Sequence, residues 1–404
     1  MAPLTYELNR VNCGYQIKNE NAKVSNLLYM DDLKIFGKNV QELKKKMKVI
    51  QTYSTDIGME MGLEKCAKVT FKRGERVKSE DIEVGGSDLS KELGENEAYK
   101  YLGMNESRGI DETQVKDRLR REYIKRVRKV LKRELNSKNR MLAIGEIAVP
   151  VLQYSFGVVN WKIKELENID RETRKMLTTY KMHHLKADVD CLYTSRKDGG
   201  RGLMQVVGAY KAAIINLSYY LHSKENDKYV GLIKRIDQDL PAGQSIMKIA
   251  RKISEEIQIE ESGNETAENP KNKIKNKILE QIKNKWVEKQ MHGQHPRAVQ
   301  EHLMDKEQTY EWLHKGELKG ETESLVIVAQ DQAINIRYHK KNILRQNVNS
   351  KCRLCEEYEK TTEHIIAGCT ILAKHEYIKD TIKSVETSII IFAKNMVSKW
   401  EKMV

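Results

Sequence analysis

Short apolar runs alternate with polar positions in the first hundred residues. Two apolar-rich runs, Val24–Tyr29 and Leu33–Phe36, flank the acidic pair Asp31-Asp32. Each run is short enough to form a strand, so the pattern predicts a β-hairpin with two carboxylates at its turn. Read alone, an Asp-Asp pair is more often a solvated turn, because aspartate is a common turn residue.

The segment after this hairpin predicts a helix and two more strands. Leu43, Met47 and Ile50 keep helical spacing over residues 40–53, while most of the lysines there fall elsewhere. Residues 66–71 and 98–103 read as short strands, separated by a connection rich in Gly, Glu and Ser.

From about residue 112 the apolar positions follow a helical period. Helices are expected over 115–135, 161–180, 206–222 and 271–290, and the acidic, polar stretch 255–270 reads as a linker. The fold class expected is therefore α+β, with a mixed N-terminal part and a mostly helical remainder. We expect four segments along the chain: 1–107, 108–225, 226–345 and 346–404.

Composition points to a polyanionic partner. The 404 residues carry a formal net charge of +14, which favours nucleic acid or an anionic membrane. No run of about 18 apolar residues occurs, so we expect no spanning helix and no membrane partner. No secretory signal is visible at the N-terminus, so a nuclear or cytoplasmic location is expected and secretion is not.

The positive charge concentrates in one predicted helix. Between Lys116 and Arg140 there are twelve Lys/Arg and three Asp/Glu. One interpretation is a solvated helix face, and the other is a helix that tracks nucleic-acid phosphates. The candidate phosphate ligands are Arg118, Arg121, Lys125, Arg126, Arg128, Lys129, Lys132 and Arg133.

Three of the six cysteines cluster near the C-terminus with a histidine. Their spacing is Cys352-x₂-Cys355-x₈-His364-x₄-Cys369. Zinc prefers four thiolate or imidazole ligands, and a Cys-x₂-Cys turn supplies two of them. The pattern predicts a structural zinc site that holds a small module with little core of its own. The alternative is three unrelated thiols and a surface histidine.

The remaining sequence features are weaker indicators of function. His183-His184 is interpreted as a polar surface pair, since no carboxylate stands at a metal-binding spacing. Trp286 and Trp312 are expected in a core or an interface. The segment 271–290 is expected to be a packed basic helix, although a membrane surface is an alternative.

Four motifs together resemble a known family, the reverse transcriptases of non-LTR (LINE-type) retrotransposons. The run 27–36, with Tyr29-Met30-Asp31-Asp32 at its centre, resembles the Tyr-x-Asp-Asp catalytic hairpin. Residues 56–66 resemble the segment that follows it in the non-LTR enzymes. Residues 99–103 resemble the primer-grip strand, and residues 198–203 resemble a Gly-rich turn beyond the thumb. The cysteine cluster resembles the C-terminal knuckle of the branch that also carries a restriction-like endonuclease.

The resemblance implies an RNA-directed DNA polymerase with a palm, a thumb and a zinc knuckle. It implies that Asp31 binds a catalytic Mg²⁺, that Asp32 is the second, supporting acid, and that Tyr29 lies under the primer end. RNA and DNA are the partners it implies, with a complementing retrotransposon protein in trans as a further one.

One departure from the family changes the expectation about activity. The family supplies another aspartate well upstream of the hairpin, whereas only Glu7 and Glu20 precede Asp31 here. Few residues follow Cys369, too few for the nuclease. We therefore expect a protein truncated at both ends that does not polymerise DNA alone. The alternatives are a non-catalytic nucleic-acid-binding remnant and a pseudogene product, which would fold poorly with exposed strand edges.

Overall fold

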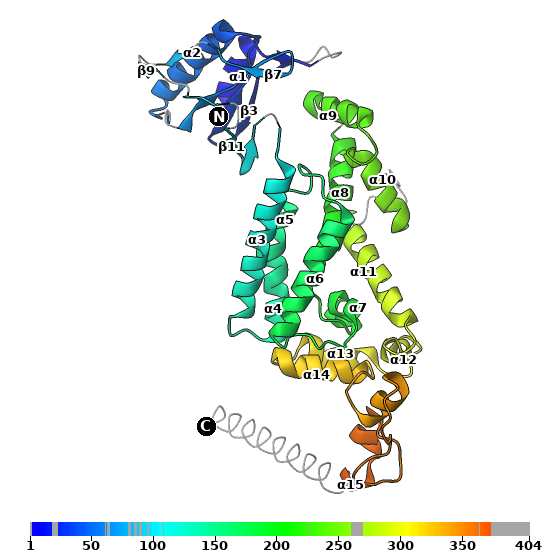
Figure 1. The fold of residues 1–404 in the computed structure, drawn as a ribbon. Helices are drawn as coiled ribbons and strands as arrows, with labels where there is room; N and C mark the ends of the chain where they lie inside the picture. The colour runs from blue at the N-terminus through cyan, green and yellow to red at the C-terminus, as the bar shows by residue number, and fades with distance from the viewer. Residues whose placement is uncertain are drawn as a thin grey trace, which may run out of the picture. The chain divides into compact units, whose positions relative to one another are not determined.

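The structure is a computed structural model that combines helices with short strands (Figure 1), which confirms the α+β class in general terms. It describes residues 2–17, 23–60, 62, 65–79, 82–84, 87–88, 91–94, 97–107, 109–224, 226–259, 270–362 and 364–372. The chain divides into two compact units, 1–122 with 155–160 and 217–249, and 123–154 with 161–216 and 250–404.

The described residues of the first unit form six two-stranded sheets. All pairings are antiparallel except that of β5 with β10. The strands are β1 (Tyr15–Gln16), β2 (Lys23–Val24), β3 (Asn26–Tyr29), β4 (Asp32–Ile35), β5 (Ala67–Lys68), β6 (Thr70–Lys72), β7 (Glu75–Val77), β8 (Glu83–Val84), β9 (Ser87–Asp88), β10 (Lys91–Glu92), β11 (Tyr99–Tyr101) and β12 (Met104–Glu106). The strands expected over 66–71 and 98–103 correspond to β5 with β6 and to β11.

Two helices, α1 (Ala2–Arg10) and α2 (Val40–Asp56), pack with the β3–β4 hairpin. Their core contains Leu4, Leu8 and Ile50, against which Leu33 and Ile35 of β4 also pack. This burial of one apolar face per element explains why the short hairpin persists, since a lone two-stranded hairpin is marginal in water.

The described residues after 111 are mainly helical, as their apolar period predicted. The α-helices are α3 (Glu112–Leu131), α4 (Ser137–Ala143), α5 (Val149–Gln153), α6 (Ile163–Thr179), α7 (Val189–Tyr193), α8 (Val206–Ser223), α9 (Lys228–Asp239), α10 (Ile246–Glu256), α11 (Pro270–Glu288), α12 (Gln294–Gln300), α13 (Lys306–His314), α14 (Gly320–Gln330) and α15 (Thr370–Leu372). Shorter turns are the 3₁₀-helix η3 (Arg196–Asp198) and the π-helices η2 (Ile144–Ala148), η4 (His339–Ile343) and η5 (His364–Gly368).

The second unit has an apolar core shared by several of these helices. Trp286 of α11 and Leu313 of α13 are buried together with Ile327 and Val328 of α14. Trp312 packs partly buried against them. Both tryptophans are therefore core residues, which confirms their interpretation.

One helix boundary differs from the sequence expectation. Helix α3 ends at Leu131, so the expected extension to Leu135 is wrong. The chain turns because Asn136 caps α4, its side chain accepting a hydrogen bond from the Asn139 N–H at 2.8 Å. Of the expected linker 255–270, residues 260–269 lie outside the described residues, as do residues 373–404.

Among the helices of the described residues, none combines the length and the apolar character needed to cross a membrane.

Candidate functional site

The acidic pair lies on a two-residue β-hairpin, as predicted. Tyr29 of β3 stands opposite Asp32 of β4, and Met30-Asp31 form the loop. Of the two loop residues only Met30 has a positive φ, +53°. A positive φ favours glycine, so a methionine in this conformation is strained.

The two carboxylates face solvent. Asp31 and Asp32 are exposed, and Tyr29 and Met30 expose 58% and 72% of their surface. Within the described part of the chain, no group of three or more metal-ligating side chains includes either aspartate. Two exposed carboxylates alone do not form a magnesium site of the usual ligand number, so the described residues do not fit the implied Mg²⁺.

A buried lysine fixes the open end of this hairpin. The Lys46 ammonium donates to the backbone oxygens of Ser25 and Phe36, both at 2.7 Å, and to the Ser25 Oγ at 2.9 Å. Burial lowers the pKa of Lys46. The interpretation that the α2 lysines lie mostly off the apolar face is wrong for Lys46, because three oxygen acceptors satisfy its ammonium in the interior.

Helix α3, drawn in cyan in Figure 1, buries one face and carries cations on the other. Tyr123, Val127 and Val130 are buried, and the Tyr123 hydroxyl lies 2.9 Å from the Thr173 Oγ1 of α6. Most of these cations stand three or four positions from the next, which places them along one side of the helix. They are Arg118, Arg121, Lys125, Arg128 and Lys129 of α3 and Lys132 directly after its last residue, and none is classed as buried.

Two of the eight predicted phosphate ligands, Arg126 and Arg133, lie outside this row of cations. Arg126 is half-buried, and its guanidinium donates to the backbone oxygen of Ile147 at 3.0 Å. Arg133 follows the end of α3, and its backbone oxygen accepts from the Arg140 guanidinium at 2.7 Å. Arg118 remains on the exposed side but donates to the Gly103 backbone oxygen at 2.6 Å.

The four residues of the Cys/His pattern converge on one point. Their ligand atoms all lie within 4.8 Å of one another. The Sγ atoms of Cys352 and Cys369 are 4.0 Å apart, and the Cys355 Sγ is 3.3 Å from the His364 Nε2. Zinc with bonds of about 2.3 Å to sulfur and 2.0 Å to nitrogen requires separations of roughly 3.5–3.8 Å in a tetrahedron. The cluster can hold a metal ion, and its geometry is compatible with zinc.

Local backbone structure builds this metal centre. The Cys352 N–H donates to the Tyr358 oxygen at 2.8 Å, and Glu356 turns the chain with a φ of +58°. The π-helix η5 starts at His364, whose N–H donates to the Thr361 Oγ1 at 3.0 Å. The Cys-x₂-Cys turn and this π-helix therefore present ligands toward each other.

The environment favours the thiolate form of one ligand. Burial raises the pKa of the Cys352 thiol, but the backbone N–H groups of Cys355 and Leu354 point at this thiol and lower its pKa to about 6. A thiolate is the form that binds metal. Cys352 and Cys369 are 2% exposed, which matches a closed structural site.

The Gly-rich turn 198–203 positions a fully buried arginine. Gly199 has a φ of +87°, and an added Cβ there would overlap the Tyr310 ring. At Gly200 a Cβ would overlap the Thr194 carbonyl. Glycine is thus required at both positions, and the turn directs Arg201 inward at 0% exposure.

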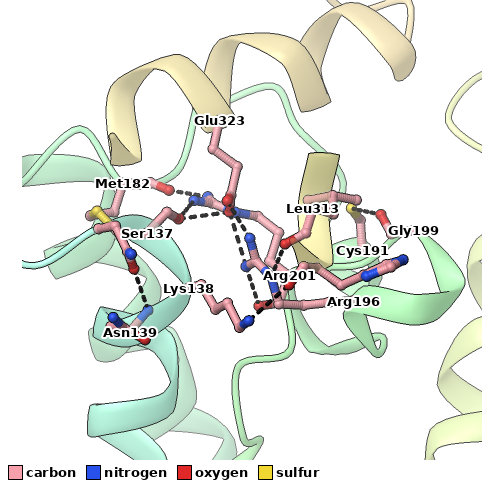
Figure 2. A network of polar contacts seen from close by, with 12 residues as sticks. Ser137, Lys138, Asn139, Met182, Cys191, Arg196, Gly199, Arg201, Leu313 and Glu323 are labelled. Carbon is pink, nitrogen blue, oxygen red and sulfur yellow. Dashed lines mark hydrogen bonds and ion pairs between the residues drawn. The ribbon is translucent and has the colours of Figure 1, made fainter. Parts of the chain in front are cut away.

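Arg201 belongs to a buried polar network with Glu323 of α14 (Figure 2). The Glu323 carboxylate accepts from the Arg201 Nε at 2.7 Å and also pairs with Arg196. The Ser137 Oγ donates to Glu323 at 2.6 Å and accepts from Arg201 at 2.8 Å. Burial raises the pKa of Glu323, but Arg201 and Arg196 outweigh it and hold that pKa below its usual value.

Sequence reasoning missed this network, although a signal was present. Gly320, Glu323, Ser324, Ile327 and Val328 are buried at the i, i+3, i+4, i+7, i+8 spacing of a core-facing helix side. An acid on that side of α14 indicated a buried carboxylate with a cationic partner.

The interpretation of His183-His184 as a surface pair is wrong for His183. Its side chain is buried at 6% exposure, while His184 is half-buried and accepts from the Lys186 N–H at 3.2 Å. Burial, assisted by the nearby Arg201, lowers the pKa of His183 to about 4, so the ring is neutral at pH 7.

No model of a known protein family matches this sequence, and no similarity to a curated protein is found.

Proposed function

We propose that this protein binds RNA and DNA and derives from the reverse transcriptase of a non-LTR retrotransposon. The observation that carries the binding proposal is the row of five cations on the side of α3 opposite its buried face, which Lys132 continues directly after the helix. Spacing of three or four residues along a helix suits successive phosphates, and such contacts give affinity without sequence readout.

Support for the reverse-transcriptase origin comes from the motifs and the hairpin. In this proposal residues 1–107 correspond to the C-terminal half of the palm, residues 108–225 to the thumb and residues 226–345 to a helical linker. The Cys352–Cys369 module is a structural zinc knuckle. The two-residue hairpin carries Tyr29-Met30-Asp31-Asp32 at its tip, the arrangement that the resemblance implies. Asp31 and Asp32 are proposed as the remaining acids of a polymerase site.

We further propose that the chain by itself is a binder rather than a polymerase. Phosphoryl transfer requires metal ions fixed by several oxygen ligands. Within the described residues Asp31 and Asp32 are joined by no third ligand. A protein supplied in trans that contributes such a ligand is the partner that synthesis would need.

Charge removal on α3 tests the binding proposal. Lys125→Gln/Lys129→Gln/Lys132→Gln is expected to weaken binding of an RNA–DNA duplex at least tenfold at low salt, because three phosphate contacts are lost. Lys275→Gln/Lys285→Gln, on the exposed side of α11, is the charge-removal control for the same fluorescence-anisotropy titration. Equal affinity of the wild type and the α3 variant would refute α3 as the binding surface.

A further inference from the structure

A second basic surface lies beside the metal centre, in a segment that sequence reasoning did not single out. From Gln332 to Cys355 the chain holds six Lys/Arg and no Asp/Glu. These cations are Arg337, Lys340, Lys341, Arg345, Lys351 and Arg353. We call residues 337–354 the basic turn.

The basic turn is held together by its own contacts, and a hydrogen bond joins it to the Cys352–Cys369 module, which we call the Cys/His module. The Lys341 Nζ lies 3.4 Å from the Ser350 Oγ, and the Arg337 guanidinium donates to the Lys351 oxygen at 3.3 Å. Ser350 is 3% exposed, and its backbone oxygen accepts from the Lys360 N–H at 2.8 Å. The π-helix η4 and the Cys-x₂-Cys turn are thereby held next to each other.

The basic turn exposes apolar side chains between its cations. Ile343, Leu344 and Leu354 expose 50%, 42% and 52% of their surface. Ile343 and Leu344 directly precede the exposed Arg345, and Leu354 directly follows the exposed Arg353. An apolar group beside a guanidinium suits a ligand that presents an anion and an apolar face together.

We propose that the basic turn binds single-stranded nucleic acid. Its cations would contact phosphates, and Ile343, Leu344 and Leu354 would cover unstacked bases. A duplex offers the same phosphates but keeps its base faces stacked, so it would leave these three side chains exposed to water. The chemistry of the surface therefore favours a single strand over a duplex. This inference rests on the proposal that the chain binds nucleic acid, but not on α3 as the surface.

Two variants of the zinc-loaded full chain separate the charge from the apolar contribution. Lys341→Gln/Arg345→Gln removes two cations and should lower the slope of log K against log salt for a single strand by about 1.4. Ile343→Ser/Leu344→Ser keeps all charges and should weaken single-strand binding about tenfold, with duplex binding changed less than twofold. The control is Lys275→Gln/Lys285→Gln on α11.

Fluorescence anisotropy with a labelled single strand of mixed sequence, and with its duplex, gives both readouts. Native mass spectrometry confirms that each variant keeps its metal. An equal loss for single strand and duplex in Ile343→Ser/Leu344→Ser would overturn the inference, as would a single-strand affinity unchanged by both variants. Binding of the basic turn to anionic phosphatidylserine vesicles, without binding to the single strand, would assign it to a membrane instead. If neither nucleic acid binds the wild type, the proposed function itself fails.

Discussion

At the scale of single residues, the buried charges of Arg201, Glu323 and Lys46 each have polar partners. Arg201 and Glu323 form a buried pair, and Arg196 and Ser137 complete their hydrogen bonds. Lys46 has no carboxylate in its hydrogen bonds but satisfies its ammonium with three oxygens. Because a buried charge is tolerated only with partners, each partner becomes a point of high sensitivity.

Loss of the Glu323 charge is expected to destabilise the protein strongly. Glu323→Gln leaves two guanidinium groups without their counter-ion, and breaking such a buried pair costs about 3–5 kcal/mol. Glu321→Gln is the matched control on the same helix, because its ion pair with Lys181 is exposed and contributes about 0–1 kcal/mol. Urea denaturation compares the two. Similar midpoints for both variants would contradict the buried network.

His183 predicts a component of acid sensitivity. Its folded pKa of about 4 lies below its ordinary value of 6.5, because burial disfavours the charged ring. Above pH 6.5 the ring is neutral in the folded and the unfolded protein, so His183 takes nothing from the free energy of unfolding. As the pH falls from 6.5 through 4, protonation of the unfolded state lowers that free energy by about 3 kcal/mol. His183→Gln should therefore show a smaller loss of unfolding free energy between pH 7 and 4 than the wild type. Parallel pH profiles of the two proteins would be inconsistent with a neutral buried ring.

At the scale of elements, the sequence pattern predicted which segments form helices and strands better than it predicted where those elements end. The hairpin at Asp31-Asp32, helix α2 and the buried face of α11 followed from alternation and helical spacing. The end of α3 did not, because Asn136 starts a new helix by capping it, and a capping asparagine resembles any other polar residue in the pattern.

The sequence predicted those parts of the candidate site whose residues lie close together along the chain. The Cys352-x₂-Cys355 turn and His364 specify their ligand geometry over a few residues. The Arg201–Glu323 pair joins positions 122 residues apart, and no local pattern states which cation meets which acid. The burial of Lys46 and His183 likewise depends on the surrounding fold rather than on neighbours in sequence.

The Cys/His module is expected to depend on its metal. Its described segment has little apolar core, so zinc binding would supply much of its folding free energy. Adding a chelator should accelerate amide hydrogen exchange across residues 350–369 while leaving the α3 amides unchanged. Cys355→Ser should reproduce this effect, and a wild type with no bound zinc by native mass spectrometry would rule the site out.

At the scale of the whole molecule, the basic surfaces proposed for binding are distinct from the acidic turn that synthesis would need. The net charge of +14, the cation row of α3 and the basic turn all favour polyanions. The hairpin carboxylates, by contrast, have no third ligand in the described residues. A protein of this kind would hold nucleic acid through surfaces that do not need the acidic turn.

Primer extension distinguishes these two activities. With an RNA template, a DNA primer, Mg²⁺ and deoxynucleotides, the chain alone is expected to give no product above background. Asp31→Ala should bind the primer–template as tightly as the wild type, because the turn makes no required contact in this account. Extension by the wild type that Asp31→Ala abolishes would show that the chain is a polymerase.

The most direct test of the central claim is lysine footprinting in the presence of an RNA–DNA duplex. Acetylation of the full chain, read by mass spectrometry, reports which ammonium groups the duplex covers. Protection of Lys125, Lys129 and Lys132, lost at high salt and absent at Lys275 and Lys285, is the result expected for phosphate contacts along α3. A bound duplex that leaves the α3 lysines as reactive as in the free protein would contradict the account.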